Sequence, residues 1–386
     1  MKTILFDLWT AQPSNGSKFH GGGEYIKSVF NHLLMNYFSE IKISVFFDFS
    51  LFLDNWILKL IENHGIEKHD IRNNKDLQTL LTNEKPNIFF SGLPYLYGNL
   101  QIPPQTFFVG TIHGLRTIEI PSDKFAYKYF KASRSIKEWV KSHFKSYFRK
   151  KRIHDFEICL KNLDSIVCVS NHTKYAIKTF FHQLSKQVNC FYTPQKVNSC
   201  NIIEHTDVAS KFILLIATNR FEKNSYRAVR ALNNLFEKGF LTNYKVVTTG
   251  NIPQSVEKSI THKSKFIHLG YVSPEKLEGL YADCDFFLYP TLNEGFGMPP
   301  LEAMKYGKTC IVSGVCSVPE VCGEAVYYIN PYDISEMENR ILMAEENKIS
   351  PEKIKAHLAT IIKSQERDLD NLFHFICSCS KKDIQK

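Results

Sequence analysis

Short apolar runs alternate with amphipathic stretches along most of the chain. The runs are rich in Ile, Val and Phe, and their length is typical of strands buried on both faces of a sheet. The stretches between them have the apolar spacing of helices. This alternation predicts βαβ units and parallel sheets. In the first half we expect strands at residues 3–8, 41–48, 87–91, 106–112, 165–169 and 188–192, and helices at 24–35 and 171–181.

A polar, irregular stretch at residues 194–210 separates this series from a second one. The second series predicts strands at 212–217, 245–249, 265–269, 286–289, 309–313 and 326–329, and helices at 225–237, 274–282, 299–306 and 334–346. The expected fold class is α/β, with two Rossmann-like, doubly wound parallel-sheet domains at residues 1–205 and 206–350. A last helix within 351–386 is expected to return to the N-terminal domain. Because open parallel sheets bind ligands at the carboxyl ends of their strands, we expect the site in the cleft between the domains.

Composition agrees with a globular chain of two domains. The 386 residues are many for one domain, and 44% are hydrophobic and 23% charged. The first residues lack the pattern of a secretory leader, and no run reaches the roughly 18 apolar residues of a spanning helix. Ten cysteines in such a chain predict reduced thiols and a cytoplasmic protein. Since no two of them form a CxxC pair, we expect no structural zinc.

The stretch 293–307, NEGFGMPPLEAMKYG, leaves an expected strand and opens an expected helix. Gly295 and Gly297 permit backbone conformations that side chains forbid, and they leave N–H groups to face a ligand. Glu302 is expected in the first helical turn, where a carboxylate complements the helix dipole. The helix dipole explains a carboxylate at Glu302, but it does not explain the one at Glu294. Two carboxylates around a glycine loop suit a ligand with several hydroxyls.

The wider stretch 270–331 resembles the donor-binding half of the retaining glycosyltransferases of family 4 (glycosyl transferases group 1), which have the GT-B fold. That family carries an E-x7-E pattern, and Glu294 and Glu302 match its spacing and its glycines. The resemblance implies that Glu294 contacts the donor sugar and Glu302 the ribose of the nucleotide. It also implies donor-binding positions near the sugar, the phosphates or the base at Gly295, Phe296, Gly297, Met298, Tyr271 and Val272.

A second cluster lies between an expected strand and the helix 225–237. Arg220 and Lys223 stand in this loop, where the family has an Arg and a Lys, and the resemblance implies that they hold the donor phosphates. Fixed cations there stabilise the charge that develops on a leaving phosphate. Glu222 occupies the place of the arginine in one version of the family pattern, so we expect Arg220 to serve instead. Ordinary solvated charges are the alternative.

Two features of the first half also match the family. Gly22 and Gly23 follow the first strand at the start of a helix, where phosphate can approach closely. The family has a similar Gly-Gly loop, so both are expected to bind the donor, with a plain hinge as the alternative. His113 ends the strand 106–112 and resembles the histidine with which the family reaches the donor sugar. A polar loop residue is the alternative for His113.

Metal chemistry is not expected. Asp283 and Asp285 look like the DxD metal motif of the other glycosyltransferase fold. They precede the strand 286–289, however, and so lie away from its ligand-facing end. The resemblance implies no metal, and a nucleotide diphosphate sugar is expected as donor substrate with no further cofactor.

The segment 124–152 is strongly basic and rich in aromatic residues. It holds eight Lys, three Arg and one Glu, a net charge of 11 − 1 = +10 in a chain of net charge +9. Its aromatic residues recur at helical spacings, which favours one helical face that docks on an anionic membrane surface. Packing on the N-terminal core and binding of nucleic acid are the alternatives, the second less favoured.

The function expected from these features is a cytoplasmic, membrane-peripheral, retaining and metal-independent hexosyltransferase. It would move a hexose from a nucleotide diphosphate sugar to a hydroxyl of a glycan or lipid-linked acceptor in surface polysaccharide biosynthesis. Two alternatives stay open. One is a nucleotide-sugar epimerase or hydrolase of the same fold, and the other is a non-catalytic sugar-nucleotide-binding subunit.

Overall fold

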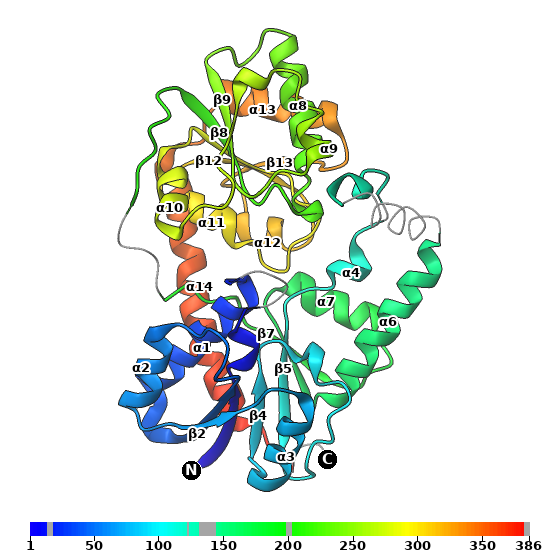
Figure 1. Ribbon diagram of the computed structural model, residues 1–386, viewed down its shortest axis with the longest axis vertical. Coiled ribbons are helices and arrows are strands. Elements are labelled where there is room, and N and C mark those ends of the chain that lie inside the picture. The colour runs from blue at the N-terminus through cyan, green and yellow to red at the C-terminus, as the bar shows by residue number, and fades with distance from the viewer. Residues whose placement is uncertain (14–17, 122, 131–143, 198–202, 382–386) are drawn as a thin grey trace. The chain divides into compact units, whose positions relative to one another are not determined.

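The computed structural model describes residues 1–386 apart from 14–17, 122, 131–143, 198–202 and 382–386. The chain forms two compact units, which Figure 1 shows as ribbons. The first unit comprises Met1–Leu115, Lys151–Ser199 and Ile362–Lys386, and the second comprises Arg116–Lys150 and Cys200–Ile361. The segment 116–150 thus groups with the second unit, whereas the sequence pattern placed it in the N-terminal domain.

The first unit contains a seven-stranded parallel sheet with the strand order β3-β2-β1-β4-β5-β6-β7. Its strands are β1 (Lys2–Asp7), β2 (Ile41–Phe47), β3 (Glu67–Asp70), β4 (Ile88–Ser91), β5 (Phe107–Ile112), β6 (Ser165–Cys168) and β7 (Gln187–Cys190). The central strands β4, β5 and β6 are buried throughout, as the continuous apolar runs predicted. The edge strand β3 was not predicted, because its sequence EKHD is polar and mostly exposed.

Helices flank this sheet (Figure 1). They are α1 (Gly21–Tyr37), α2 (Asn55–Asn63), α3 (Asn74–Glu84), α6 (Lys145–Asn162), α7 (Asn171–Phe180) and α14 (Pro351–Ser378), with short 3-10 helices at Trp9–Ala11, Phe38–Glu40 and Pro94–Leu96. The last part of α14 packs on α1 within the first unit. Phe373 stacks on Tyr37 with ring centroids 3.7 Å apart, and Asp370 accepts hydrogen bonds from Tyr37 Oη (2.8 Å) and His32 Nε2 (2.9 Å).

The second unit contains a six-stranded parallel sheet with the order β10-β9-β8-β11-β12-β13. Its strands are β8 (Lys211–Leu215), β9 (Tyr244–Thr248), β10 (Phe266–His268), β11 (Phe286–Tyr289), β12 (Thr309–Ser313) and β13 (Tyr327–Ile329). Its helices are α4 (Arg116–Glu119), α8 (Ser225–Glu237), α9 (Gln254–Glu257), α10 (Pro274–Asp283), α11 (Met298–Met304), α12 (Val318–Cys322) and α13 (Ile334–Glu346), with 3-10 helices at Ala126–Tyr129, Phe221–Lys223 and Lys263–Lys265.

Alternate residues of these strands pack against helices on opposite faces of the sheet. Ile213 and Leu288 belong to one buried hydrophobic cluster with side chains of α8 and α13, which lie together in Figure 1. Phe287 faces the other way and packs edge-on against Tyr281 of α10, with ring centroids 5.3 Å apart. The expected α/β architecture of two doubly wound parallel sheets is therefore confirmed. No helix in the described part of the chain has the length and apolarity needed to span a bilayer.

The strand order fixes where a ligand site can form in the second sheet. Strands β8 and β11 are hydrogen-bonded neighbours, but the chain continues from β8 to β9 on one side and from β11 to β12 on the other. The carboxyl ends of β8 and β11 therefore lie at the switch point of this sheet, where the direction of the connections reverses. Open α/β sheets bind ligands at such a switch point.

Candidate active site

Lys223 and Glu294 meet at this switch point. Lys223 follows β8 and Glu294 follows β11, and the lysine Nζ lies 2.5 Å from the glutamate Oε1. The same Oε1 accepts hydrogen bonds from Tyr289 Oη (2.6 Å) and Thr291 Oγ1 (3.0 Å). Lys223 also donates to Tyr289 Oη. Two residues predicted from separate motifs are thus brought into one cluster.

Both charged side chains are nearly buried, with 9% of Lys223 and 12% of Glu294 exposed. Burial favours the neutral carboxyl of Glu294, but the Lys223 ammonium and its hydrogen bond outweigh burial and hold the pKa of Glu294 below its ordinary value. Burial also lowers the pKa of Lys223, and Glu294 offsets part of that effect. Glu294 is therefore a carboxylate at neutral pH whose oxygens face a water-poor site.

The loop after β8 is shaped by Asn224, which sequence reasoning did not single out. Asn224 has a left-handed backbone (φ 58°) and turns the chain from the 3-10 helix Phe221–Lys223 into α8. Its Nδ2 donates to the carbonyls of Pro290 (3.0 Å) and Pro331 (2.7 Å). Asn224 therefore fixes the lysine loop to the exit of β11. An asparagine suits this position because it tolerates the left-handed region.

Ser317 holds the glycine loop after β11 in place. Its Oγ lies within hydrogen-bond distance of the carbonyls of Glu294 (3.0 Å) and Phe296 (2.9 Å), so its one proton bridges the two. Gly297 has φ 104°, a conformation that side chains rarely adopt, and directly precedes α11. Phe296 is buried, while Gly295 and Met298 are partly exposed. Donor binding by these four loop positions stays a prediction.

Glu302 was expected in the first helical turn, and this placement is wrong. The helix α11 begins at Met298, so Glu302 is its fifth residue, and no acidic residue lies in the first turn. Glu302 is 5% exposed, and its Oε2 accepts a hydrogen bond from Tyr281 Oη (3.0 Å). A dipole-capping role therefore no longer explains this carboxylate, and its contact with a ribose stays a prediction.

The glycines of the first unit lie where α1 begins. A Cβ on Gly22 would come within 2.8 Å of Leu93 Cδ1, and one on Gly23 within 3.0 Å of the Ala11 carbonyl. The Gly23 N–H donates to His20 Nδ1 (3.1 Å), which caps the helix. Close packing thus accounts for the missing side chains, and donor binding at Gly22 and Gly23 stays a prediction.

His113 is partly buried in the loop after β5. Its ring meets that of Tyr25 edge-on, with centroids 4.8 Å apart, and its Nε2 lies 2.9 Å from the Gly92 carbonyl. Burial lowers the pKa of His113 to about 4, so the imidazole is neutral at neutral pH. Because a carbonyl only accepts, Nε2 carries the proton and Nδ1 is left as a hydrogen-bond acceptor.

Four further residues that the sequence analysis discussed are placed as follows. Tyr271 and Val272 follow β10 at the edge of the second sheet, and Tyr271 is 77% exposed. Asp283 ends α10 and Asp285 precedes β11, at the opposite end of that strand from Glu294, as predicted. Asp285 instead accepts a hydrogen bond from the Phe212 N–H (3.1 Å).

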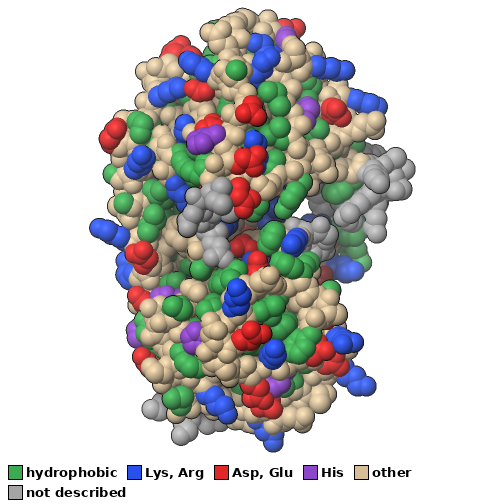
Figure 2. Space-filling model, turned by 60° about the vertical axis from the view of Figure 1, so that its left-hand side comes forward, with side chains coloured by type: hydrophobic (Ala, Val, Ile, Leu, Met, Phe, Trp, Pro, Cys, Tyr) green, Lys and Arg blue, Asp and Glu red, His purple; other side chains and the backbone are tan. Residues whose placement is uncertain are grey.

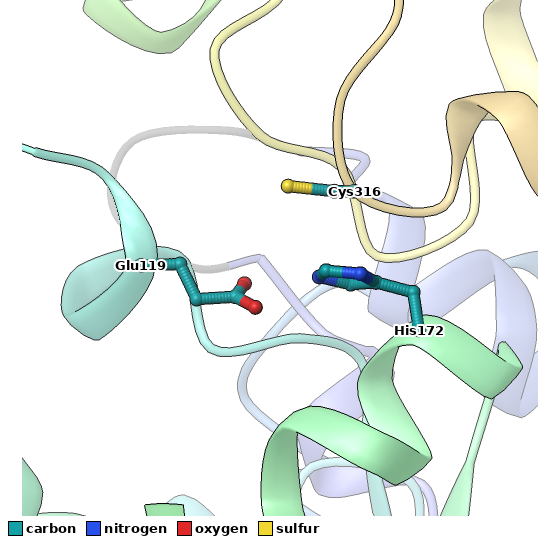
Figure 3. Close-up of side chains that lie close together, drawn as sticks. All are labelled: Glu119, His172 and Cys316. Atoms are coloured by element: carbon teal, nitrogen blue, oxygen red, sulfur yellow. The ribbon is translucent and has the colours of Figure 1, made fainter. Parts of the chain in front are cut away.

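Asn293 links the site to α4. Its Nδ2 donates to Glu119 Oε2 (2.8 Å) and to Cys316 Sγ (3.0 Å). Figure 3 shows Glu119 on α4 and Cys316 on the loop that leads to α12. Asn293 is therefore a positioning residue at the start of the glycine loop, and sequence reasoning had assigned it no role.

The basic segment 124–152 does not form one helix in its described part. Phe125 precedes the 3-10 helix Ala126–Tyr129, and Tyr129 ends it. Both side chains pack against the hydrophobic core of the second unit. Phe144 and Tyr147, by contrast, are 61% and 66% exposed near the start of α6. Residues 131–143 lie outside the described part. On the face drawn in Figure 2, basic and acidic side chains are interspersed.

Two units, each with a doubly wound parallel sheet, are the arrangement of the GT-B fold. Residues 203–358 match the family model of the glycosyl transferases group 1. This match lies within the second unit, and it confirms the resemblance that was stated from the motifs there.

Among relatives, the serotype-specific mannosyltransferase WbdA of Escherichia coli is 28% identical over 174 residues, 43% of this chain and 21% of that protein. The chain thus spans about a fifth of that relative's length. A glycosyltransferase structure from Rickettsia africae superposes with a TM-score of 0.65 and 14% identity over 98% of this chain and 99% of that one. The structure of the Anabaena protein HepE in complex with UDP-glucose superposes with a TM-score of 0.63 and 13% identity, over 97% of this chain and 100% of that one. At these identities the two structures show the shared fold.

Proposed function

We propose that this chain is a retaining hexosyltransferase that uses a nucleotide diphosphate sugar. Its acceptor would be a hydroxyl of a glycan or lipid-linked saccharide in surface polysaccharide biosynthesis, such as that of lipopolysaccharide or capsule. The observation that carries the proposal is the buried Lys223–Glu294 pair at the β8–β11 switch point. The named activity of WbdA, a mannosyltransferase, and the UDP-glucose bound to HepE support this choice of reaction and donor class.

Each side chain has a place in the proposed reaction. Lys223 and Arg220 contact the donor diphosphate, and Glu302 contacts the ribose. Glu294, a carboxylate at neutral pH, accepts hydrogen bonds from hydroxyls of the sugar. His113, which is neutral with Nδ1 as an acceptor, receives a hydrogen bond from an outer sugar hydroxyl.

The proposed step is a front-face displacement. The bond between the anomeric carbon and the phosphate oxygen breaks, and its electron pair stays on the diphosphate. The acceptor oxygen bonds to the same carbon from the face that the diphosphate leaves, and its proton passes to a leaving phosphate oxygen. Lys223 and Arg220 stabilise the charge that grows on the diphosphate, so no metal is required in this scheme.

Nucleotide sugars are expected to stabilise the chain against heat. UDP-, GDP- and ADP-sugars should each be tested by differential scanning fluorimetry, and the matching nucleotide at about 100 times its Kd should raise Tm by about 5–10 °C. Lack of any shift with all three nucleotide families would count against the proposed function. Donor turnover without an acceptor would instead favour the hydrolase or epimerase alternative.

We also propose that exposed aromatic and basic residues at the start of α6 bind an anionic membrane surface. Phe144 and Tyr147 are exposed beside the basic residues Arg149 and Lys150, and Trp or Phe with basic charge suits the headgroup region. Liposome flotation should show binding to anionic but not zwitterionic vesicles, reduced by salt.

The double variant Phe144→Ser with Tyr147→Ser is expected to lose most of that binding. Tyr175→Ser is the matched control, because Tyr175 on α7 is 61% exposed and lies outside the segment. Equal flotation of the double variant and the control would refute the assignment of membrane binding to α6.

A further inference from the structure

Glu222 holds two arginine side chains beside the Lys223–Glu294 pair. Its Oε1 accepts hydrogen bonds from Arg116 Nη1 (2.6 Å) and Arg220 Nε (2.8 Å), and Arg220 Nη2 also donates to it. Glu222 is 15% exposed, whereas Arg116 and Arg220 are each 44% exposed. One inner carboxylate thus orients two guanidinium groups whose outer faces reach solvent.

Residues 116–121 and 123–130, here called the strap, hold Arg116 in this position. Glu119 accepts a hydrogen bond from Asn293 (2.8 Å), and Asp123 forms a buried ion pair with Arg227 (2.7 Å). Tyr129 Oη accepts a hydrogen bond from the Tyr226 N–H (2.7 Å). The strap is therefore fixed to the first turn of α8, which directly follows the loop of Lys223, and to the loop after β11, which carries Glu294.

The Glu222 main chain joins the two charged clusters. Its carbonyl accepts a hydrogen bond from the Leu292 N–H (2.7 Å), and Thr291 Oγ1 lies 3.0 Å from the same carbonyl oxygen. That same Thr291 hydroxyl lies within hydrogen-bond distance of Glu294 Oε1 (3.0 Å). The Thr291 side chain therefore lies against the main chain of Glu222 and the carboxylate of Glu294, which holds the two charged clusters side by side.

The charges of these side chains leave an excess suited to an anion. Three cations, Arg116, Arg220 and Lys223, face the two carboxylates Glu222 and Glu294, which gives 3 − 2 = +1. Burial would raise the pKa of Glu222, but Arg220 and Arg116 outweigh burial and keep that pKa below its ordinary value. Glu222 is therefore a carboxylate at neutral pH and counts as a negative charge. Guanidinium groups bind phosphate through paired N–H donors, and each arginine here keeps an exposed side.

We propose that Arg116 and Arg220, aligned by Glu222, form a two-arginine clamp for the diphosphate of the donor. Arg116 is then a donor-binding residue supplied by the strap, and Glu222 is a positioning residue. This inference rests on the proposed function and deepens it. It also gives Glu222 a purpose in the place where the resembling family has an arginine.

Binding of UDP, GDP and ADP, and of the corresponding monophosphates, tests the clamp by titration calorimetry. Arg116→Gln should weaken binding of the preferred diphosphate about tenfold, or about 1.4 kcal/mol, and should change monophosphate binding less. Arg116→Lys should restore part of the loss, because it keeps the charge without the fork of donors. Arg340→Gln is the matched control, since Arg340 pairs with Glu336 on α13 and its side chain is 42% exposed.

Glu222→Gln separates alignment from simple repulsion. If Glu222 aligns the arginines, its replacement should weaken diphosphate binding severalfold. Tighter binding would show that Glu222 only repels the phosphate and would overturn the proposal, as would unchanged binding by Arg116→Gln. If the wild-type chain bound no nucleotide, the proposed function and the clamp would fall together. If the wild-type chain bound nucleotide and Arg116→Gln bound it equally well, the clamp would be refuted and the proposed function would stand.

Discussion

Replacing Glu294 by glutamine is expected to lower kcat by about 10²–10³ while the chain stays folded at the assay temperature. Glutamine has nearly the same shape, and its Oε1 can still accept hydrogen bonds from Tyr289 and Thr291, which lie 2.6 and 3.0 Å from that atom. What the variant loses is the negative charge that Glu294 carries at neutral pH. In the proposed reaction this charge stabilises a sugar that becomes cationic as the diphosphate leaves, so the loss should appear in kcat more than in KM.

Steady-state kinetics with the donor found by the thermal-shift screen measures this effect. Glu338→Gln is the matched control, because Glu338 is a 5% exposed glutamate paired with Lys238 (2.6 Å) at the other end of α8. The control should keep its kcat. If the Glu294→Gln variant kept the wild-type kcat, Glu294 would not be an active-site residue.

Much of the sheet architecture could be predicted because the central strands are buried on both faces. The bounds of β11 (Phe286–Tyr289) and α8 (Ser225–Glu237) agree with the sequence prediction. The helices α2 and α3 and the strand β3 (Glu67–Asp70) were missed. Exposed residues interrupt the apolar pattern in all three of these elements. Periodicity reports burial, and it therefore weakens where an element is half exposed.

The candidate site could be predicted only in part, because some of its contacts join residues that no local sequence pattern connects. Lys223 and Glu294 stand in short motifs, and both were identified. Tyr289 was taken for a core residue because it ends an apolar run, yet its hydroxyl binds both of them. Arg116 lies 106 residues from its partner Glu222, so no local pattern connects the two. The pairing follows from the packing of the strap against α8 and the loop after β11 within the second unit.

Removing Lys223 alone is expected to destabilise the second unit strongly. In Lys223→Met, the carboxylate of Glu294 keeps the neutral hydroxyls of Tyr289 and Thr291 as neighbours, in a site where it is 12% exposed. Breaking a buried ion pair in this way costs about 3–5 kcal/mol. Glu294→Gln should cost less, because burial already lowers the pKa of Lys223 and the lysine can release its proton. Denaturant unfolding followed by fluorescence measures each loss.

The double variant Lys223→Met with Glu294→Gln should recover much of the stability that the single change Lys223→Met loses, since no unpaired charge is left buried. Its kcat should nevertheless be no higher than that of Glu294→Gln, which separates the catalytic charges from the fold. Acid provides a second check on the same pair. The folded-state pKa of Glu294 lies below its unfolded value of 4.5, so the stability that its charge contributes is present above pH 4.5 and is lost as pH falls through the folded pKa. The stability difference between the wild-type chain and Glu294→Gln should therefore narrow below pH 4.5, and a double variant no more stable than Lys223→Met would show that the two charges are not coupled.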